Sequence, residues 1–192
     1  EMLPYMSFET KALTIEQETL AEHVQREIAY IETHFLYDTA VSAYGDGDWD
    51  DTLQPADPLQ KKQMASTWTE ELTIETFRTA ARAFESIPAL ASQFEKLATA
   101  MMADFRKYFM QGEVLPGFIR MDTHHKVTPL IYPGDPITKV NYRLLPLSQG
   151  VLSHILVDQE VPQALKVIKE QLLFPDGVRL MDQPSTYHGG VS

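Results

Sequence analysis

Four aspartates, two glycines and one tryptophan lie together in a short segment of the chain. This segment, which we call the acidic segment, reads Tyr44-Gly45-Asp46-Gly47-Asp48-Trp49-Asp50-Asp51. Carboxylates at such close spacing raise one another's pKa, and an aromatic side chain that excludes water strengthens the effect. A carboxylic acid that keeps its proton near neutral pH can act as a general acid, and tryptophan offers a flat apolar face for a sugar ring. The residues therefore suit chemistry at a glycosidic bond.

Two other interpretations of the acidic segment stay open on its residues alone. The first is a solvated acidic turn, and the second is a calcium site. Asp46, Asp48 and Asp50 occupy positions 1, 3 and 5 of a twelve-residue loop. An EF-hand, however, needs Gly at position 6 and Glu at position 12, where this chain has Asp51 and Asp57. We therefore expect no metal.

Apolar periodicity predicts helices that would hold this segment in place. The five predicted helices cover 14–35, 67–85, 88–110, 146–157 and 160–173. Thr14 with Gln17 is a capping-box pattern at the start of the first. Thr67 with Glu70 repeats that pattern at the start of the second, and Pro88 suits the first turn of the third.

Each predicted helix has an expected buried stripe. For the second helix the stripe is Leu72, Phe77, Ala81 and Phe84. For the third it is Phe94, Leu97, Met101, Phe105 and Tyr108. For the last it is Val161, Leu165, Ile168 and Leu172. Residues at spacings of three and four share one helix face, so these stripes should meet in the core.

The connections 36–66 and 111–145 are too long for a simple helix bundle, in which connections of about 2–8 residues are usual. The second contains two predicted strands, 117–121 and 127–131. Long ordered loops in compact domains tend to carry function. The helices suit a toroid of helical hairpins, although periodicity alone does not distinguish it from an open array. The chain shows no internal repeat and no linker, so we expect one domain over 1–192.

Composition and charge exclude several classes of function. The net charge is −11 and the 16 basic residues are scattered, whereas a nucleic-acid surface needs clustered Lys and Arg. The chain has no cysteine, which excludes disulfides and thiol catalysis and makes the cytoplasm the expected compartment. No apolar stretch could span a membrane. We therefore expect neither a nucleic-acid nor a membrane partner.

Several segments in order along the chain resemble a known enzyme family. The segment 47–53, which reads Gly-Asp-Trp-Asp-Asp-Thr-Leu, is similar to the GDWNDGL-type motif of the cellobiose phosphorylase family of inverting glycoside phosphorylases. The segment 176–184, followed by Tyr187 and a Gly pair, is similar to the family's PDGxRLMxxP segment. The segments 129–133 and 142–146 resemble two further parts of the family pattern. The residues of the acidic segment most resemble those of one branch of the family, which contains 1,2-β-oligoglucan phosphorylases and cyclic β-1,2-glucan synthases.

This resemblance implies an all-α fold, a partial (α/α)6-barrel with a small β excursion near 113–135, as one piece of a larger catalytic domain. It implies that Asp48 protonates the bridging oxygen of a β-linked glucan while inorganic phosphate attacks the anomeric carbon from the opposite face. The product would be α-glucose 1-phosphate, and no protein base or cofactor would be needed. The family has Asn where this chain has Asp50, a departure that adds a negative charge beside the acid.

The resemblance also implies a set of binding residues. Those for the sugar are Tyr44, Trp49, Asp50, Asp51, Arg179 and Tyr187, and His188 is the candidate for phosphate. Arg143 could equally neutralise phosphate or form a structural ion pair. The expected partners are an oligosaccharide, phosphate and the remainder of the polypeptide, and a homo-oligomer stays open. The alternatives are an inverting hydrolase on the same barrel and a non-catalytic glucan-binding module of a synthase.

The first prediction concerns the isolated chain. The family completes its phosphate site with a Thr-Gly pair beyond the catalytic Asp, and no counterpart precedes Ser192. The 192-residue chain alone should therefore release little or no glucose 1-phosphate from β-glucans in the presence of phosphate. Robust turnover by this chain, measured with a coupled glucose 1-phosphate assay, would contradict the prediction.

Overall fold

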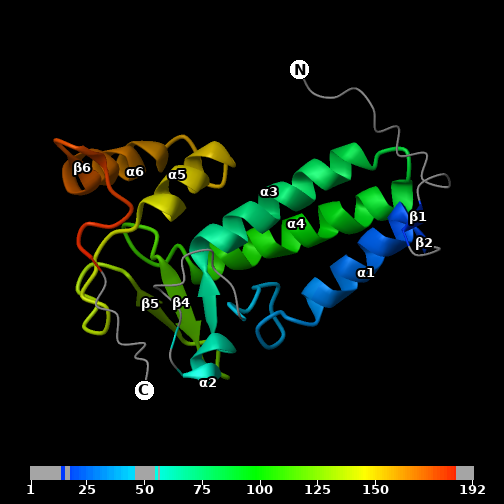
Figure 1. Cartoon of the computed structure of the whole chain (residues 1–192), viewed down its shortest axis with the longest axis horizontal. Helices are drawn as coiled ribbons and strands as arrows, with labels where there is room; N and C mark the ends of the chain where they lie inside the picture. Colours follow the sequence, from blue (N-terminus) through cyan, green and yellow to red (C-terminus); the bar gives the residue numbers. More distant parts are fainter. Residues whose placement is uncertain (1–13, 16–17, 46–54, 56, 185–192) are drawn as a thin grey trace.

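The computed structural model describes residues 14–15, 18–45, 55 and 57–184 (Figure 1). Its helices are α1 (Leu20–Glu32), α2 (Pro58–Lys61), α3 (Thr67–Ala83), α4 (Pro88–Tyr108), α5 (Leu144–Leu152), α6 (Val161–Val167) and the π-helix η2 (Ile168–Leu172). Its strands are β1 (Thr14–Ile15), β2 (Glu18–Thr19), β3 (Met64–Ser66), β4 (Phe118–Met121), β5 (Val127–Leu130), β6 (Leu173–Phe174) and β7 (Gly177–Val178). The mostly helical class is confirmed, whereas the barrel stays a prediction.

Helices α3 and α4 form a long hairpin at the centre of the molecule, with α1 alongside (Figure 1). The predicted stripe of α4 is confirmed, since Phe94, Leu97, Met101, Phe105 and Tyr108 are all buried. Pro88 occupies the first turn of α4, as expected. The ring of Phe94 lies 5.5 Å from that of Phe77 and 5.8 Å from that of Phe84, so aromatic contacts join the two helices near their connecting turn.

The buried face of α3 differs in part from the predicted one. Phe77 and Phe84 are buried as predicted, whereas Leu72 and Ala81 are only half-buried. The other buried residues of α3 are Thr67, Glu70, Glu71 and Ile74. The predicted capping box is also wrong, because Ser66 is the N-cap and its Oγ accepts from the Thr69 amide at 3.4 Å. Glu70 does not turn back to the helix start. Its carboxyl group points inward and accepts a hydrogen bond from another part of the chain.

The predicted start of the first helix is wrong by six residues. Thr14–Ile15 pairs with Glu18–Thr19 as a short hairpin, and α1 begins only at Leu20. The capping box is formed by Thr19 and Glu22 rather than by Thr14 and Gln17. Glu22 accepts from the Thr19 amide at 2.8 Å, and the Glu22 amide donates to the Thr19 hydroxyl at 3.3 Å.

The last two helices differ from their predicted limits and faces. The predicted helix 146–157 is α5, which begins at Leu144 and ends at Leu152. The predicted helix 160–173 is α6 followed by η2, and its buried residues are Ala164, Val167 and Leu172. Leu165, expected in the core, is 52% exposed. The π-helical turn is the reason, because it widens the spacing between buried positions to five residues.

A three-stranded antiparallel sheet lies against one end of the α3–α4 hairpin, in the strand order β3-β4-β5 (Figure 1). Strands β4 and β5 confirm the strands predicted over 117–121 and 127–131, but β3 was missed because it is only three residues long. The register pairs Ser66 with Phe118, and Phe118 with Leu130. Strand β3 leads directly into α3, so the sheet fixes the point at which α3 begins.

Glycines allow two close approaches around this end of α3. Gly117 donates to Ile131 O at 3.0 Å and accepts from the Thr67 amide at 3.2 Å, which joins the sheet to α3. A Cβ atom at Gly117 would lie 2.8 Å from Ile131 Cβ. A Cβ atom at Gly150 of α5 would lie 2.9 Å from the Glu71 carboxyl oxygen Oε1 and 3.1 Å from Leu156 Cγ.

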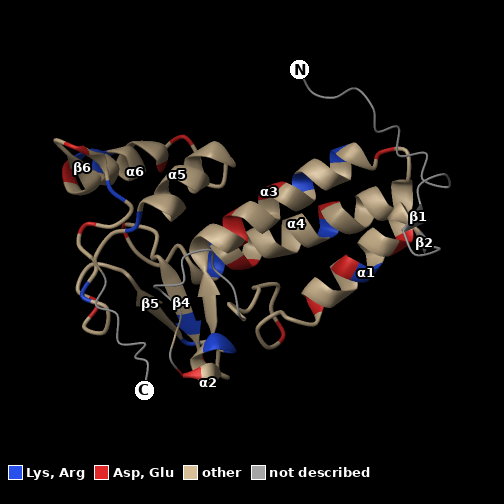
Figure 2. Cartoon of the chain, in the orientation of Figure 1, with Lys and Arg blue, Asp and Glu red and all other residues tan. Residues whose placement is uncertain are grey.

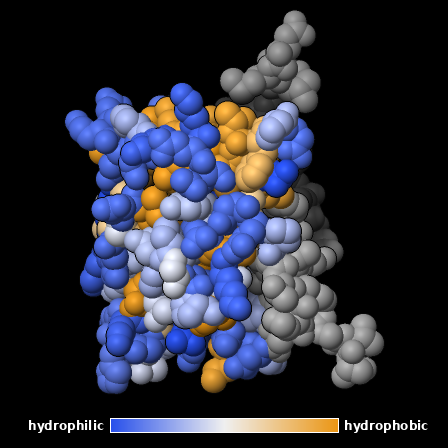
Figure 3. Space-filling model, turned by 90° about the vertical axis from the view of Figure 1, so that its left-hand side faces the viewer, coloured by the Kyte–Doolittle hydropathy of each residue, from blue (hydrophilic) through white to orange (hydrophobic). Residues whose placement is uncertain are grey.

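The surface carries both signs of charge along the helices (Figure 2). The end of the molecule that carries α5, α6 and β6 is mostly hydrophilic, with hydrophobic residues in separate patches (Figure 3). Within the described part of the chain, no helix is both long and apolar enough to cross a membrane.

The second prediction concerns Gly117. Gly117→Ala should lower the free energy of unfolding by about 1–3 kcal/mol, because the added methyl group overlaps Ile131 Cβ in a closely packed interior. Urea unfolding followed by circular dichroism measures the change. The control is Glu113→Ala, at an exposed position in the same connection, which should change stability by less than about 0.5 kcal/mol. Equal effects at the two positions would contradict the close approach.

Candidate functional site

Most residues predicted to carry the chemistry lie outside the described residues. These are Asp48, Trp49, Asp50, Asp51, Tyr187 and His188. Tyr44 and Arg179 are described, and so are the groups that border the acidic segment on both sides. The described residues contain no cluster of His, Asp and Glu that could hold a metal ion, but the calcium interpretation concerns residues beyond them. The site is therefore built from its described border.

The chain enters the acidic segment through residues 40–45, which we call the stem. In an extended chain successive amides point to opposite sides. In the stem, the alternate amides of Ala40, Ser42 and Tyr44 donate hydrogen bonds to three different structural elements. The three acceptors are Asp104 Oδ2 of α4 at 2.7 Å, Glu70 Oε1 of α3 at 2.5 Å and Met64 O of β3 at 2.6 Å. Two of the three acceptors are side-chain carboxyl groups.

The other amides of the stem are also bonded. The Val41 amide donates to the Thr39 hydroxyl at 3.2 Å, and the Ala43 amide donates to His34 O at 2.8 Å. The Gly45 amide donates to Lys61 O, at the end of α2, at 3.2 Å. Every amide of the stem therefore has an acceptor, as buried backbone groups require.

Gly45 and Asp57, which stand before and after residues 46–51 in the chain, both lie beside α2. Gly45 has a φ of +59°, which a glycine adopts at no steric cost, and its amide is bonded to Lys61, the last residue of α2. Asp57 caps α2 by accepting from the Leu59 amide at 2.8 Å. The described structure thus places these two points of the chain in the same small region.

Two carboxyl groups are buried at the start of α3, next to the stem. Glu70 is 1% exposed and Glu71 is fully buried, and Figure 2 shows acidic residues of α3 at its end next to the sheet. Burial raises the pKa of Glu70 to about 8, the Ser42 hydrogen bonds oppose that shift, and the charge of Asp104 adds to it. Burial also raises the pKa of Glu71 well above its usual range. Burial thus favours the neutral, protonated form of both groups.

The hydrogen bonding of these two acids differs. Glu70 Oε1 accepts from Ser42, whereas both carboxyl oxygens of Glu71 lack a hydrogen-bond partner among the described residues. The protonated form of a carboxyl group is uncharged, so its burial costs less free energy. An ionised carboxylate would be far more expensive to desolvate. Glu70 thus holds the stem through a hydrogen bond. Glu71 is a buried acid beside it whose carboxyl group makes no such bond among the described residues.

A second, smaller hydrophobic cluster joins the segments that resemble the phosphorylase family. Its members are Tyr44, Met64, Phe118, Leu130, Ile131 and Val140, with Met181 packed against them. Phe118 contacts two residues that the sequence analysis named as candidates for binding sugar or phosphate, Tyr44 and Arg143. The ring of Tyr44 lies edge-on to it at 5.5 Å, and the guanidinium of Arg143 lies over it at 4.9 Å. The stem and three of the motif-bearing segments, 129–133, 142–146 and 176–184, therefore meet around this cluster.

Hydrogen bonds join the segment 176–184 to the segment 142–146. Asp182 Oδ1 accepts from the amides of Asn141 and Tyr142, each at 3.0 Å, and Asp182 Oδ2 accepts from the Asn141 side chain at 2.9 Å. The Leu144 amide donates to Leu180 O at 2.8 Å. Arg143, which is 2% exposed, lies between these contacts, so the C-terminal motif is held against the residue that covers Phe118.

Arg179 lies in a different environment from Tyr44. Its side chain is half exposed, and its guanidinium stacks on the Phe174 ring at 3.7 Å and pairs with Asp176 at 3.3 Å. These contacts are within the β6–β7 hairpin and its flanking residues. The described structure therefore brings Tyr44 and Arg143 together but places Arg179 apart from them, and its assignment to sugar binding stays a prediction.

Sequence reasoning missed the carboxyl groups that hold the stem. The signal for Glu70 and Glu71 was present, because extending the buried positions Ile74 and Phe77 backwards at helical spacing reaches them. Asp104 is likewise three residues after Met101 on the buried stripe of α4. A carboxylate within an apolar stripe is the pattern that would have identified both helices as sources of inward-pointing acids.

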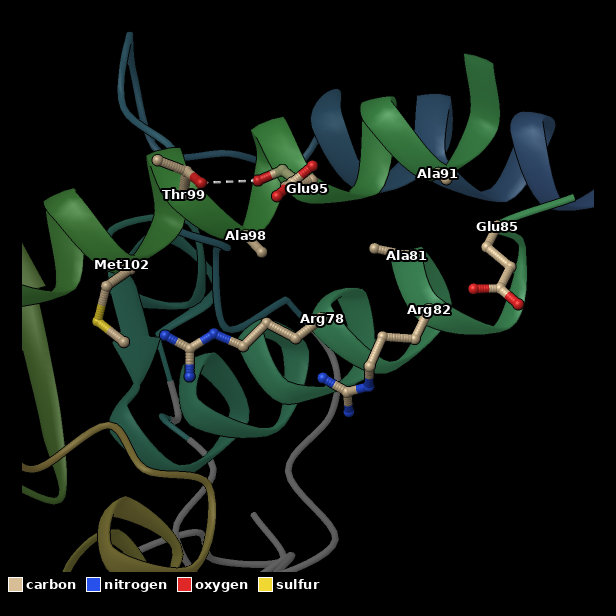
Figure 4. Close-up of a pocket in the computed structure, with 9 residues that line it drawn as sticks. All are labelled: Arg78, Ala81, Arg82, Glu85, Ala91, Glu95, Ala98, Thr99 and Met102. Carbon is tan, nitrogen blue, oxygen red and sulfur yellow. Dashed lines mark hydrogen bonds between the residues drawn. The ribbon is translucent and has the colours of Figure 1, made fainter. Parts of the chain in front are cut away.

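A separate groove of about 570 Å³ lies between α3 and α4 (Figure 4). Its alanines are Ala81, Ala91 and Ala98, and charged residues line its edges. Arg78 donates to Ser153 O at 3.1 Å and Arg82 pairs with Glu75 at 3.7 Å. Neither Tyr44 nor Arg179, the predicted site residues that the structure describes, lines this groove, and no residue of the stem does.

Comparison with known proteins adds one relative. The chain is 43% identical to 1,2-beta-oligoglucan phosphorylase of Listeria innocua serovar 6a, over an alignment of 193 positions that includes the whole chain. The resemblance inferred from the motifs is thus confirmed. The alignment spans 17% of the relative's length. No protein-family model matches the chain.

The third prediction concerns pH and stability. Glu70 keeps its proton up to a pKa of about 8 in the folded chain, against 4.5 as the ordinary value. Its contribution to stability is therefore complete below about pH 4.5 and is lost as pH rises toward 8, because only the unfolded chain releases the proton in that range. We expect the free energy of unfolding to fall by a few kcal/mol between pH 5 and pH 8.

Glu70→Gln tests this cause directly. The amide cannot ionise but still offers an oxygen to the Ser42 amide, so urea unfolding should show a shallower dependence on pH than in the unchanged chain. Glu71→Gln should also reduce the slope, and the double variant should be nearly independent of pH over this range. An unchanged slope in the double variant would show that these acids are not the source.

Proposed function

We propose that the chain supplies the general acid of an inverting phosphorylase that acts on β-linked glucans. The observation that carries the proposal is the 43% identity to a 1,2-beta-oligoglucan phosphorylase across the whole chain, acidic segment included. That relative's name makes β-1,2-linked oligoglucans the proposed substrate and inorganic phosphate the co-substrate. The hydrogen bonds of Gly45 and Asp57 beside α2 support the proposal, because a catalytic acid needs a chain held on either side of it.

The proposed reaction has one proton transfer and one displacement. The Asp48 carboxylic acid donates its proton to the bridging oxygen, and the leaving sugar departs with the electron pair of the broken bond. A phosphate oxygen attacks the anomeric carbon from the opposite face and forms α-glucose 1-phosphate. Phosphate is already an anionic nucleophile, so the scheme is that of an inverting glycosidase without its general base.

The proposed binding groups follow the family resemblance. Trp49 and Tyr187 would lie against sugar rings, and Asp50 and Asp51 would accept hydrogen bonds from sugar hydroxyls. His188 would contact phosphate. Tyr44 contributes to the same region through its packing on Phe118.

Neither buried carboxyl group beside the stem suits the role of a hydrolase base. An inverting hydrolase needs a second, ionised carboxylate about 6.5–9.5 Å from the acid to activate water. Glu70 and Glu71 border the stem, but both are closed to solvent, and burial raises the pKa of both. The proposed phosphorolysis needs no such base, because phosphate itself is the nucleophile.

The fourth prediction tests the acid. In the natural polypeptide that contains these residues, Asp48→Asn should lower phosphate-dependent turnover of β-1,2-oligoglucans by about 10²–10⁴-fold, the usual value of general acid assistance. Amide and carboxylic acid are nearly the same size, so sugar binding should survive. β-Glucosyl fluoride, whose leaving group departs without a proton, should react with phosphate at a much less reduced rate.

The internal controls are Asp50→Asn and Asp51→Asn. They should alter sugar affinity or the pH optimum without this dependence on the leaving group. Production of glucose 1-phosphate separates the three candidate functions, because a hydrolase would release glucose without phosphate and a non-catalytic module would release neither. Near-normal glucan turnover by Asp48→Asn would show that the acid has been assigned wrongly.

A further inference from the structure

The stem depends on side chains for hydrogen bonds that a neighbouring strand would usually supply. On the side that faces the helices, the Ala40 amide reaches Asp104 and the Ser42 amide reaches Glu70, before Tyr44 joins the backbone of β3. Ser42 is the middle of these three points, four residues before the first aspartate of the acidic segment. One carboxyl group of α3 thus supplies the acceptor for the Ser42 amide, while the amides of Val41 and Ala43 on either side of it are bonded to Thr39 and His34.

We propose that Glu70 is a positioning residue for the chemistry of the acidic segment, because its carboxyl group holds the Ser42 amide and thereby the stem through which the chain enters that segment. The proposal rests on the proposed function of Asp48. Glu70 is buried and contacts the stem rather than any open surface, so it acts on the reaction only through the stem. It is not a catalytic residue.

Loss of the Glu70 acceptor would act directly on the stem. The Ser42 amide would lose the carboxyl oxygen to which it donates, and an amide that loses its acceptor away from solvent is disfavoured. The stem would therefore shift locally at Ser42, between its remaining bonds at Val41 and Ala43. Displacement of the stem would also displace the acidic segment that follows it. Asp48 would then be misplaced for donating its proton to the bridging oxygen of the glucan.

The neighbouring acid provides a matched control. Glu71 lies on the same turn of α3, is equally buried and also keeps its proton. No described residue donates a hydrogen bond to its carboxyl oxygens. Replacing Glu71 by Met therefore changes the core in the same way as replacing Glu70 by Met, but leaves the stem amide bonded.

The experiment compares Glu70→Met, Glu70→Gln and Glu71→Met in the natural polypeptide, with β-1,2-oligoglucan plus phosphate and with β-glucosyl fluoride plus phosphate. Glu70→Met should lower kcat on the oligoglucan by about 10²-fold, as misplacement of a reacting group does, with KM changed by less than about threefold. Its turnover of the fluoride should change far less. Glu70→Gln, which keeps the acceptor, and Glu71→Met should stay close to the unchanged enzyme on both substrates.

Amide hydrogen exchange of the 192-residue chain gives a second, independent measurement. Peptides that cover residues 40–45 should exchange faster in Glu70→Met than in Glu70→Gln or Glu71→Met. Glu70→Asp, which withdraws the carboxyl group by one methylene, should give a smaller change in the same direction and serves if Glu70→Met does not fold.

Three results would overturn the proposal. Unchanged exchange over 40–45 in Glu70→Met would show that the carboxyl group does not hold the stem, whatever the assays give. Equal losses on oligoglucan and fluoride would show a general structural effect rather than positioning of the acid, and so would equal losses in Glu70→Met and Glu71→Met. The proposed function fails separately, if Asp48→Asn itself lacks the dependence on the leaving group.

Discussion

The hydrogen-bonding demand of the stem is the constraint on which the described site depends. Six consecutive residues of the stem are buried or half-buried, and the amide of each has an acceptor. Where β3 cannot supply one, Glu70 and Asp104 do so from two different helices. This arrangement explains why an acid occupies the buried face of α3, where an apolar residue would ordinarily pack better. It also explains the raised pKa of Glu70, because the group must be enclosed in order to reach Ser42.

The second hydrophobic cluster complements these polar contacts. Phe118 of β4 contacts Tyr44 on the stem and Arg143 at the start of α5. Met181 packs on the same cluster, and Asp182 fixes the chain beside it through three hydrogen bonds. Segments separated by more than a hundred residues are thus held together by one ring and one carboxylate. The three described motifs that resemble the phosphorylase family, 129–133, 142–146 and 176–184, are spatial neighbours for this reason.

Sequence patterns predicted the elements whose burial is purely apolar. The stripe of α4, from Phe94 to Tyr108, follows helical spacing throughout and was predicted correctly. The prediction for α3 failed at Leu72, because its true core face carries Glu70 and Glu71, which a polarity pattern assigns to solvent. Leu165 was misplaced because the π-helical turn changes the spacing on which the pattern relies. The acidic segment was found by its composition, but the hydrogen bonds of its stem have no periodic signal.

The close packing around Gly150 links three positions of the chain. The backbone of α5 passes so close to its neighbours that a Cβ atom at position 150 would lie 2.9 Å from the Glu71 carboxyl oxygen Oε1 and 3.1 Å from Leu156 Cγ. The Glu71 carboxyl group is the far end of a flexible side chain and can shift, but Leu156 would also have to give way. A larger residue at 150 therefore requires adjustment at both neighbours, and substitutions at 150 should be accompanied among homologues by changes at 71 and 156.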